Sequence, residues 1–347
     1  MTNAYRWIQW NRHKRVFDGV LAGILAAYIA GFVGIGLAAV PADRAVSPPV
    51  LLIRAFGTAA AILLHVILAI GPLARISPLF APILYNRRHL GVTCFALAML
   101  HAVLATGFYG GFGDANPLLA VLAGPGVRPP FEIYGFGALL ILFVMAATSH
   151  DFWLANLGHR VWKWMHMGVY AAYLLLIAHI AFGALASEKS SVYIVLVAAG
   201  VLGLAGLHLF AGFREFRRDH AGVAVSEWID LGPCMDIPES RARVVCVRDR
   251  ERVAVFRDGD RLHAVTSVCA HQGGPLAEGK IVDGCITCPW HGYQYRPGDG
   301  CSPPPYTEKI ATYELRVESG RVLLNPDPNP PGTPVSPAEV PKEVPDG

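Results

Sequence analysis

Two cysteines and two histidines in the last third of the chain have spacings typical of metal ligands. Cys269 and His271 form a C-x-H pair, and after sixteen intervening residues Cys288 and His291 form a C-x-x-H pair. Thiolates and imidazoles are soft and borderline ligands, so these four side chains suit one small inorganic centre. A structural zinc site is the competing interpretation, because Cys285 stands three residues before Cys288 and would complete a Cys-x-x-Cys pair.

The residues around the two pairs resemble those of a known electron carrier. The flanking residues that match are Gly273, Gly274, Pro275, Pro289 and Gly292. With them, the segment from about 223 to 324 resembles a Rieske ferredoxin domain, the electron carrier of aromatic-ring dioxygenases. The resemblance implies a [2Fe–2S] cluster in which Cys269 and Cys288 hold one iron while His271 and His291 hold the other.

Three positions depart from the pattern of the Rieske proteins of respiratory quinol oxidation. Those proteins carry an extra cysteine in each loop, joined as a disulfide, and a serine after the second His-Gly. Here the positions hold Gly274, Trp290 and Tyr293. Without the disulfide and the hydroxyl donor, the oxidised cluster is relatively better stabilised, so we expect a midpoint potential toward the low end of the Rieske range of about −150 to +300 mV.

A second set of histidines lies in the apolar first part of the chain, where ionisable side chains are costly and a function is the default expectation. An imidazole is a usual axial ligand of haem iron, and a bis-histidine site needs two helices that offer one at the same depth. Counted from the cations that precede each span, His89 matches His166 and His101 matches His179. The two levels lie about 18 to 20 Å apart along a helix, but thirteen residues rotate by about 140°, so His166 and His179 would not share a face of an ideal helix.

Two stretches of this region carry a second resemblance: GPLARISPLFAPILYNRRHLGVTCFALAMLHAV and AATSHDFWLANLGHRVWKWMHMGVYAAYLLLIAHI. Residues from about 50 to 185 are similar to the ferric reductase-like transmembrane domain, a family that includes the haem-binding membrane subunit of methionine sulfoxide reductase. The resemblance implies that His101, His166 and His179 bind haem b. For the fourth ligand of a two-haem arrangement we favour His89, with His65 as the alternative. For any single histidine, the competing interpretation is a buried side chain satisfied by helix–helix hydrogen bonds.

The helices that must position these histidines are predicted from apolar runs long enough to cross a bilayer. We expect a membrane all-α six-helix bundle over 17–212, after a cytoplasmic N-terminus at 1–16. A cleaved signal peptide is the alternative for the first run, which is longer than the usual signal core of about 7 to 15 residues. The six predicted spans are 17–40, 50–73, 89–110, 131–149, 162–184 and 191–212.

The rest of the chain changes character after a charged linker at 213–222. Short β-branched runs and the turn signals Asp258-Gly259 and Ser319-Gly320 predict a small all-β antiparallel domain over 223–324. The proline-rich tail at 325–347 has little apolar bulk and is expected to be disordered or extended.

Composition and charge limit the classes of function. Only 16% of the residues are charged, against about 25% in ordinary soluble domains. The net charge of +3 is too small to indicate nucleic-acid binding, and the seven cysteines do not form a disulfide framework. Lys and Arg gather in the loops on one side of the spans, which predicts a bacterial-type inner membrane protein with both termini and the β domain in the cytoplasm.

The expected centres together predict an oxidoreductase component of electron transport. It would pass electrons between a cytoplasmic [2Fe–2S] cluster and two b-type haems in the lipid bilayer, and it would need a separate electron donor such as a flavoprotein reductase or a ferredoxin. We assign no residue to acid–base chemistry on a substrate. The alternatives are a quinone-reactive oxidoreductase subunit and a membrane-anchored Rieske ferredoxin without haem.

Overall fold

The residues of the chain group into two compact units. The computed structural model describes residues 12–38, 46–80, 83–84, 86–109, 116, 131–149, 153, 157, 159–187, 190–220, 228–247, 251–271, 273–289, 292–304 and 306–341. One unit lies within Trp7–Ile70 and Asn86–Leu207 and is helical. The other, within Gly71–Tyr85 and His208–Gly347, joins the ends of two helices to a β domain.

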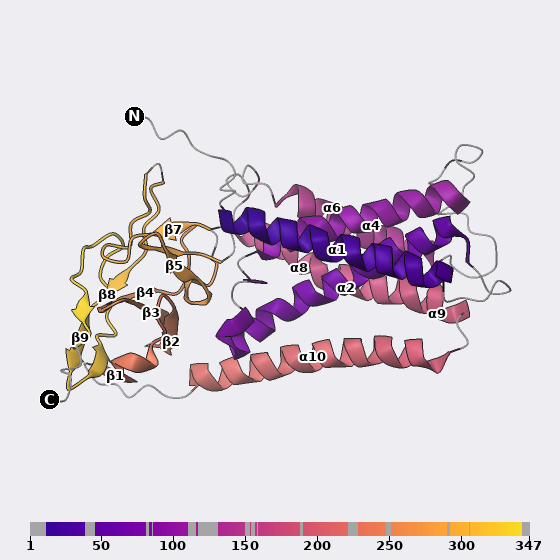
Figure 1. Ribbon diagram of the computed structural model, residues 1–347. Helices are drawn as coiled ribbons and strands as arrows, with labels where there is room; N and C mark the ends of the chain where they lie inside the picture. Colours follow the sequence, from indigo (N-terminus) through magenta and orange to yellow (C-terminus); the bar gives the residue numbers. More distant parts are fainter. Residues whose placement is uncertain are drawn as a thin grey trace. The chain divides into compact units, whose positions relative to one another are not determined.

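Six long helices are present in the described residues, as the sequence predicts (Figure 1). They are α1 Arg12–Ala38, α2 Pro48–Ile76, α4 Arg87–Tyr109, α6 Glu132–Ala147, α8 His159–Phe182 and α10 Ser191–His220, with the short turns η2 Pro78–Phe80 and α9 Ala184–Ser187. Five of them have the length and composition to cross a bilayer, and the sixth, α6, is a shorter apolar helix of 16 residues. The chain is therefore a multi-pass membrane protein.

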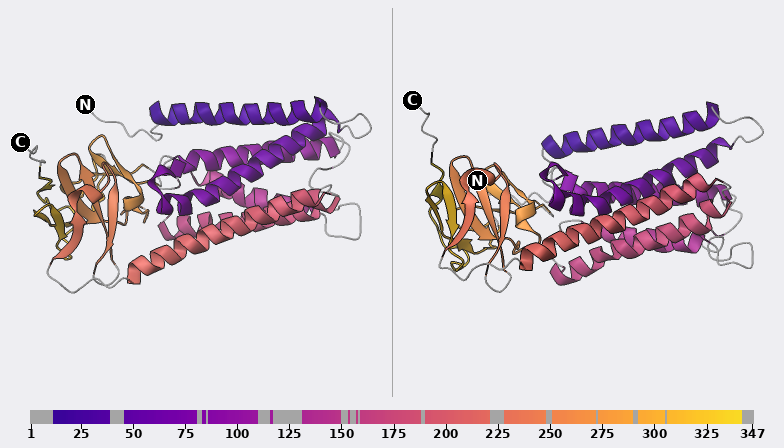
Figure 2. Two further views of the ribbon diagram at one scale, coloured as in Figure 1. Left: turned by 60° about the horizontal axis from the view of Figure 1, so that its bottom comes forward. Right: turned by 90° about the horizontal axis from the view of Figure 1, so that it is seen from below.

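The helices differ in how much of their apolar surface other helices cover. In α2, 44% of the most apolar stretch is buried, whereas in α1 the value is 0%. Large side chains such as Val20 and Ile24 of α1 and Leu202 of α10 are more than half exposed, which suits contact with lipid. Helices α4, α6 and α8 pack side by side (Figure 2). The histidines of α4 and α8 therefore stand next to other helices.

The β domain consists of three antiparallel sheets in the described residues, with strand orders β1-β10-β9, β11-β4-β3-β2 and β5-β6-β7; β8 also pairs with β4. The strands are β1 Ile229–Pro233, β2 Ala242–Cys246, β3 Arg252–Asp258, β4 Arg261–Thr266, β5 Lys280–Val282, β6 Cys285–Thr287, β7 Gln294–Tyr295, β8 Thr312–Tyr313, β9 Leu315–Glu318, β10 Arg321–Leu324 and β11 Ala338–Glu339, with the turns η4 Cys234–Asp236 and η6 Leu276–Glu278. This agrees with the predicted small all-β antiparallel domain.

Both predicted hairpins are present. Strands β3 and β4 pair as far as Asp258 and Arg261, and β9 and β10 pair from Glu318 and Arg321. Gly259 has a φ of +63°, and Ser319 and Gly320 have φ values of +50° and +73°. Positive φ values are what short hairpin turns require.

The central sheet separates two apolar cores because successive side chains of a strand point to opposite faces. Val253 and Val255 of β3 lie in one core, whereas Ala254 and Phe256 lie in the other. The second core also contains Cys269 and Cys288, the leading residues of the two predicted ligand pairs. One face of the sheet therefore supports the candidate cluster.

The charged segment expected as a linker is largely helical. Helix α10 continues to His220, so residues 213–220 extend the last apolar span rather than leave it. Arg and Glu are good helix formers, and this explains why the helix outlasts its apolar stretch. Residues 221 and 222 lie outside the described residues.

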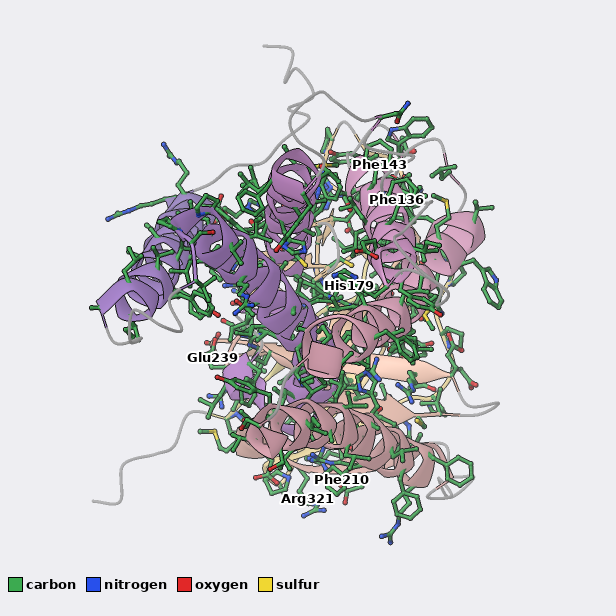
Figure 3. The ribbon with its side chains drawn as sticks, turned by 90° about the vertical axis from the view of Figure 1, so that its right-hand side faces the viewer. Phe136, Phe143, His179, Phe210, Glu239 and Arg321 are labelled. Atoms are coloured by element: carbon green, nitrogen blue, oxygen red, sulfur yellow. The ribbon has the colours of Figure 1, made fainter. Side chains whose placement is uncertain are left out.

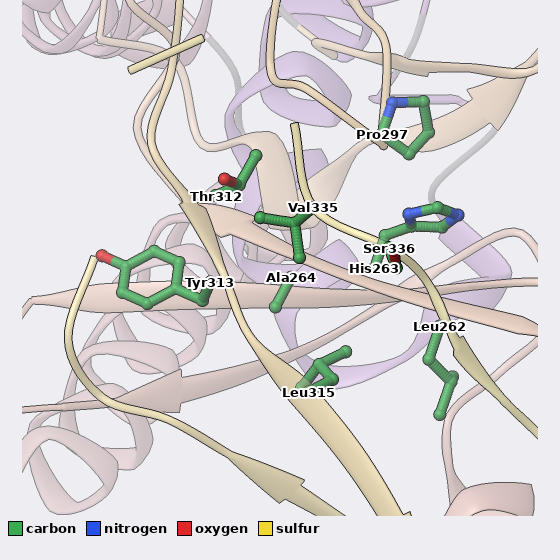
Figure 4. Close-up of a pocket in the computed structure, with 9 residues that line it drawn as sticks. All are labelled: Leu262, His263, Ala264, Pro297, Thr312, Tyr313, Leu315, Val335 and Ser336. Carbon is green, nitrogen blue, oxygen red and sulfur yellow. The ribbon is translucent and has the colours of Figure 1, made fainter. Parts of the chain in front are cut away.

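The proline-rich tail follows an extended path, but the expectation of disorder is wrong for residues 325–341. Strand β11 pairs antiparallel with β4, and the N–H groups of Asn329 and Val335 donate to the carbonyls of Thr312 and Gly298. Val335 also lines a small pocket beside β4, together with Leu262 and His263 of that strand (Figure 4). Backbone hydrogen bonds are open to any residue except proline as donor, so low apolar content did not prevent ordering. Residues 342–347 lie outside the described residues.

Candidate metal centres

The two predicted cluster loops close around their cysteines in the same way. In each, the cysteine N–H donates to the carbonyl five residues later, and the N–H of the glycine four residues later donates to the cysteine carbonyl, at 2.7–2.9 Å. The residues are Cys269, Gly273 and Gly274 in the first loop and Cys288, Gly292 and Tyr293 in the second. Gly273 and Gly292 have φ values of +71° and +72°, which residues with a side chain rarely adopt. The fold thus presents two cysteines from matching turns.

The two cysteine thiols suit a soft metal centre. Cys269 and Cys288 are only 2% and 1% exposed and lie in one apolar core as free thiols. His271, the third predicted ligand, is half-buried on the first loop. His291 lies outside the described residues, and the described part of the chain alone gathers no group of three or more candidate ligands. The donor set as a whole therefore stays a prediction, which the geometry of the loops fits.

A tyrosine that the sequence reasoning missed reaches the first ligand loop. The hydroxyl of Tyr295 lies 3.3 Å from Cys269 Sγ and accepts a hydrogen bond of 3.2 Å from the N–H of His271. Burial, followed by the neighbouring Cys269 thiol, raises the pKa of Tyr295. The phenol therefore keeps its proton, and it can donate that proton to a thiolate sulfur. The sequence offered no periodic signal for this tyrosine, because strand β7 consists of Gln294 and Tyr295 alone.

A second tyrosine stacks on a predicted ligand. The ring of Tyr293 lies 4.4 Å from the ring of His271, and the two planes differ by only 9°. The Tyr293 hydroxyl donates to the Glu308 carboxylate. Burial, followed by this carboxylate, raises the pKa of Tyr293. The residue that stands where other Rieske proteins carry serine thus fixes the plane of His271 through its ring.

The competing Cys-x-x-Cys zinc site finds no support in the position of Cys285. This thiol is half-buried on β6, whereas Cys288 lies in the apolar core. Burial raises the pKa of Cys285, and its charged neighbours are Arg296, Asp283 and Asp299. Cys285 therefore lies among charged side chains on β6, outside the apolar core that holds Cys288.

In the helical unit, His101 of α4 and His179 of α8 are brought together. Their ring centres lie 6.2 Å apart, with the planes at 82°, and His179 lies between the helices when they are viewed end-on (Figure 3). Nδ1 of His101 donates to the Ile53 carbonyl at 2.9 Å, and Nδ1 of His179 donates to the Phe131 carbonyl at 3.0 Å. Because a carbonyl only accepts, each Nδ1 carries the proton and each Nε2 keeps a lone pair for a metal.

The separation of these two rings fits one metal ion between them. A metal-bound imidazole nitrogen lies about 2 Å from the metal and about 1.1 Å from its own ring centre, so two rings that face one ion lie about 6 Å apart. The observed 6.2 Å agrees with this value. His101 and His179 could therefore hold haem iron, which would supply one-electron transfer at this site.

The other predicted pair, His89 and His166, is not brought together by any contact among the described residues. Nδ1 of His89 lies 2.7 Å from the Asp18 carboxylate of α1. The ring of His166 stacks on Trp162 at 3.7 Å, its Nδ1 bonds to the Trp162 carbonyl, and its Nε2 lies 3.5 Å from Ser149 Oγ. His89 and His166 were matched by their predicted depth in the membrane, but equal depth alone does not make their rings face each other.

The alternative fourth ligand, His65, turns toward other helices. Its Nδ1 lies 2.9 Å from the Tyr173 hydroxyl of α8, and a Cβ on Gly200 of α10 would lie 3.4 Å from its Cε1. This is the environment of a histidine satisfied by helix–helix contacts. A carboxylate on Nδ1 is typical of a metal-binding histidine, so these contacts favour His89 over His65.

Comparison with known families supports both resemblances. Residues 227–314 match the Rieske [2Fe-2S] domain, and residues 56–177 match the ferric reductase like transmembrane component. The β domain and part of the helical region thus match the two family models that their motifs predicted.

Individual relatives cover separate parts of the chain. The anthranilate 1,2-dioxygenase ferredoxin subunit of Burkholderia cepacia is 35% identical over 106 residues, which are 30% of this chain and 95% of the relative. The protein-methionine-sulfoxide reductase heme-binding subunit MsrQ of Herminiimonas arsenicoxydans is 35% identical over 112 residues, 32% of this chain and 49% of the relative. Among solved structures, the complex of reduced oxygenase and oxidized ferredoxin in carbazole 1,9a-dioxygenase matches with 26% identity and a TM-score of 0.28 over 30% of this chain and 96% of that chain.

Proposed function

Because this chain belongs to the Rieske [2Fe–2S] family and also carries the ferric reductase-like transmembrane domain, we propose that it passes electrons between a Rieske cluster and b-type haem in the membrane. The cluster and a bis-histidine haem are both one-electron carriers. The observation that carries the proposal is the pair of His101 and His179, whose rings lie at the spacing that one iron needs. Cys269, His271, Cys288 and His291 are the proposed cluster ligands.

Contacts within the second compact unit support a cluster held at the membrane surface. Arg75 near the end of α2 pairs with Glu278 at 2.9 Å, and Glu215 of α10 pairs with Arg252 of β3 at 3.2 Å. Glu278 lies in η6, which follows the first ligand loop directly. Arg75 and Glu215 stand at the helix ends that the distribution of Lys and Arg assigns to the cytoplasm.

We also propose an electron source that would suit this arrangement. A cytoplasmic cluster is accessible to a soluble donor, so we propose a flavoprotein reductase or a ferredoxin as the electron source. The relative from Burkholderia cepacia is itself a ferredoxin subunit of a dioxygenase system. In this scheme, Tyr295 and Tyr293 orient and tune the cluster ligands, and the carbonyls of Ile53 and Phe131 fix the tautomers of the haem ligands.

A redox titration of the purified full-length protein in detergent tests the proposal. Haem absorbance and the low-temperature electron paramagnetic resonance of the cluster are followed in the same samples. We expect a Rieske signal together with low-spin haem b. Replacing His101 or His179 by leucine should remove a haem signal and leave the Rieske signal intact. A protein that binds the cluster but no haem would refute the proposal and leave a membrane-anchored ferredoxin.

A further inference from the structure

Two residues of α2, Ile53 and Gly57, form the surface on which the His101 ring rests, and we call such a surface the seat of the histidine. The carbonyl of Ile53 accepts the hydrogen bond from Nδ1 of His101, and Gly57 stands four residues later. A Cβ at Gly57 would lie 2.8 Å from His101 Nδ1 and 2.9 Å from its Cε1. These distances are shorter than van der Waals contact allows, so the imidazole occupies the space that a side chain at position 57 would take.

The seat of His179 repeats this arrangement on α6. The carbonyl of Phe131 accepts from Nδ1 of His179, and Gly135 again stands four residues later. A Cβ at Gly135 would lie 2.7 Å from His179 Nδ1 and 2.8 Å from its Cε1. In both seats a carbonyl acceptor is followed four residues later by a glycine, and a Cβ on that glycine would lie 2.7–2.9 Å from Nδ1 and Cε1 of the histidine.

The repetition has a fixed offset and extends beyond the seats. Each residue of the second seat stands 78 positions after its counterpart in the first. The same offset relates the contact of His65 with Tyr173, at 5.7 Å, to the contact of Phe143 with Phe95, at 5.8 Å. The first joins α2 to α8 and the second joins α6 to α4. Adding 78 to His65 gives Phe143, and subtracting 78 from Tyr173 gives Phe95. The two hairpins therefore change places between the first contact and the second, as a twofold rotation requires.

We infer that α2–α4 and α6–α8 are two copies of one helical hairpin related by an approximate twofold axis, and that Gly57 and Gly135 are equivalent positioning residues that seat His101 and His179 on opposite sides of one haem iron. Buried side chains at matching positions agree with this, since Ala60 corresponds to Ala138 and Leu64 corresponds to Leu142. The inference rests on the proposed function because it takes the two histidines as haem ligands.

Glycine is required at these positions for a geometric reason. In a helix the Cα–Cβ bond tilts toward the N-terminus, so a side chain overhangs the carbonyl of the residue four positions earlier. That carbonyl has a second lone pair in addition to the one used by the helix. Glycine leaves this lone pair open to an incoming imidazole. An alanine would push the ring off its carbonyl and turn its Nε2 away from the metal.

The test compares the full-length protein with the variants Gly57→Ala and Gly135→Ala. Haem per cluster is measured by absorbance, and haem retention is measured against a haem-binding competitor protein. Because changes next to metal ligands typically weaken metal affinity about 10- to 100-fold, we expect a loss of that size in each variant. Both losses should fall on the same haem signal. The oxidised haem should also show a shifted largest g value, since its line shape depends on the angle of 82° between the two rings.

Matched controls separate the seat from a general effect of alanine in a membrane helix. Cβ atoms at Gly71 of α2 and Gly206 of α10 would meet nothing within 4 Å, so Gly71→Ala and Gly206→Ala should retain haem like the unchanged protein. The Rieske signal gives the amount of protein with an intact β domain in every sample. If Gly57→Ala does not fold, His101→Gly replaces it: free imidazole should restore the haem signal in His101→Gly but not in His101→Gly/Gly57→Ala.

The outcomes are distinguishable. Normal haem retention and an unchanged resonance signal in either seat variant would overturn the inference, and so would effects of the two variants on different haem signals. Equal imidazole rescue with and without Gly57→Ala would overturn it as well. Absence of haem from the unchanged protein would instead refute the proposed function.

Discussion

The hydroxyl of Tyr295 should raise the reduction potential of the proposed cluster, and Tyr295→Phe should therefore lower it. Tyr295 is completely buried, and its oxygen lies 3.3 Å from Cys269 Sγ. An iron-bound thiolate has no proton, so the phenol must be the donor. The bond becomes stronger when the cluster is reduced, because the sulfur then carries more negative charge.

The size of the shift follows from the strength of such a bond. A hydrogen bond to a charged group contributes about 1.5–3 kcal/mol, and we take about 0.5–1.5 kcal/mol of it as the difference between the two oxidation states. For a one-electron couple, about 1.4 kcal/mol corresponds to about 59 mV. The midpoint of Tyr295→Phe should therefore fall by about 20–60 mV. This hydroxyl also moderates the low potential expected from the absence of the disulfide and of the serine.

Voltammetry of the purified protein, with the resonance signal as a check on cluster content, measures this shift. Tyr313→Phe is the matched control because Tyr313 is equally buried in the other core of the same domain, and it should leave the midpoint unchanged. An unchanged or raised midpoint in Tyr295→Phe, with normal cluster content, would refute the assignment of Tyr295 as a donor to the cluster sulfur.

Three further predictions concern the haem ligands and the membrane surface. His89→Leu should remove a second haem signal, if one is present, while His65→Leu should spare it; the reverse result in absorbance titrations would make His65 the fourth ligand. Asp18→Asn should raise the lower of two haem midpoints, because it removes the carboxylate from Nδ1 of His89. Arg75→Gln should slow cluster-to-haem electron transfer in stopped-flow measurements by up to about fivefold, since an exposed ion pair such as that with Glu278 contributes about 0.2–1 kcal/mol. Added salt should slow the transfer in the same way.

The sequence predicted best the depth at which each candidate histidine ligand lies in its membrane span. Counting residues from the loop cations placed His101 and His179 at one level, and the structure brings their rings to 6.2 Å. The same counting paired His89 with His166, which the structure does not bring together. Depth along a membrane helix is readable from hydropathy, whereas rotation about the helix axis depends on packing that a single sequence does not show.

Short elements and backbone partners were beyond sequence reasoning for a similar reason. Strands β5 to β7 have two or three residues each, too few for an alternating pattern to appear. The acceptors for His101 and His179 are the backbone carbonyls of Ile53 and Phe131. Every residue has a carbonyl, so the type of residue at positions 53 and 131 carries no signal. The glycines four residues later, Gly57 and Gly135, are such a signal, but they can be interpreted only when the positions of the imidazole rings are known.

The repeat also explains why the second histidine level is different from the first. His89-Leu-Gly-Val and His166-Met-Gly-Val are copies of one motif, but they stand 77 residues apart, whereas His101 and His179 stand 78 apart. Helix α8 therefore contains one more residue than α4 between its two histidines, which rotates His166 by about 100° from the equivalent position.

A consequence for the direction of electron transfer follows from this asymmetry. At the first level both rings are held by neutral carbonyls. At the second level one ring is held by the Asp18 carboxylate, whose negative charge would stabilise oxidised iron. A haem bound through His89 would have the lower potential, so electrons that entered from the predicted cytoplasmic side would fall toward the His101–His179 site.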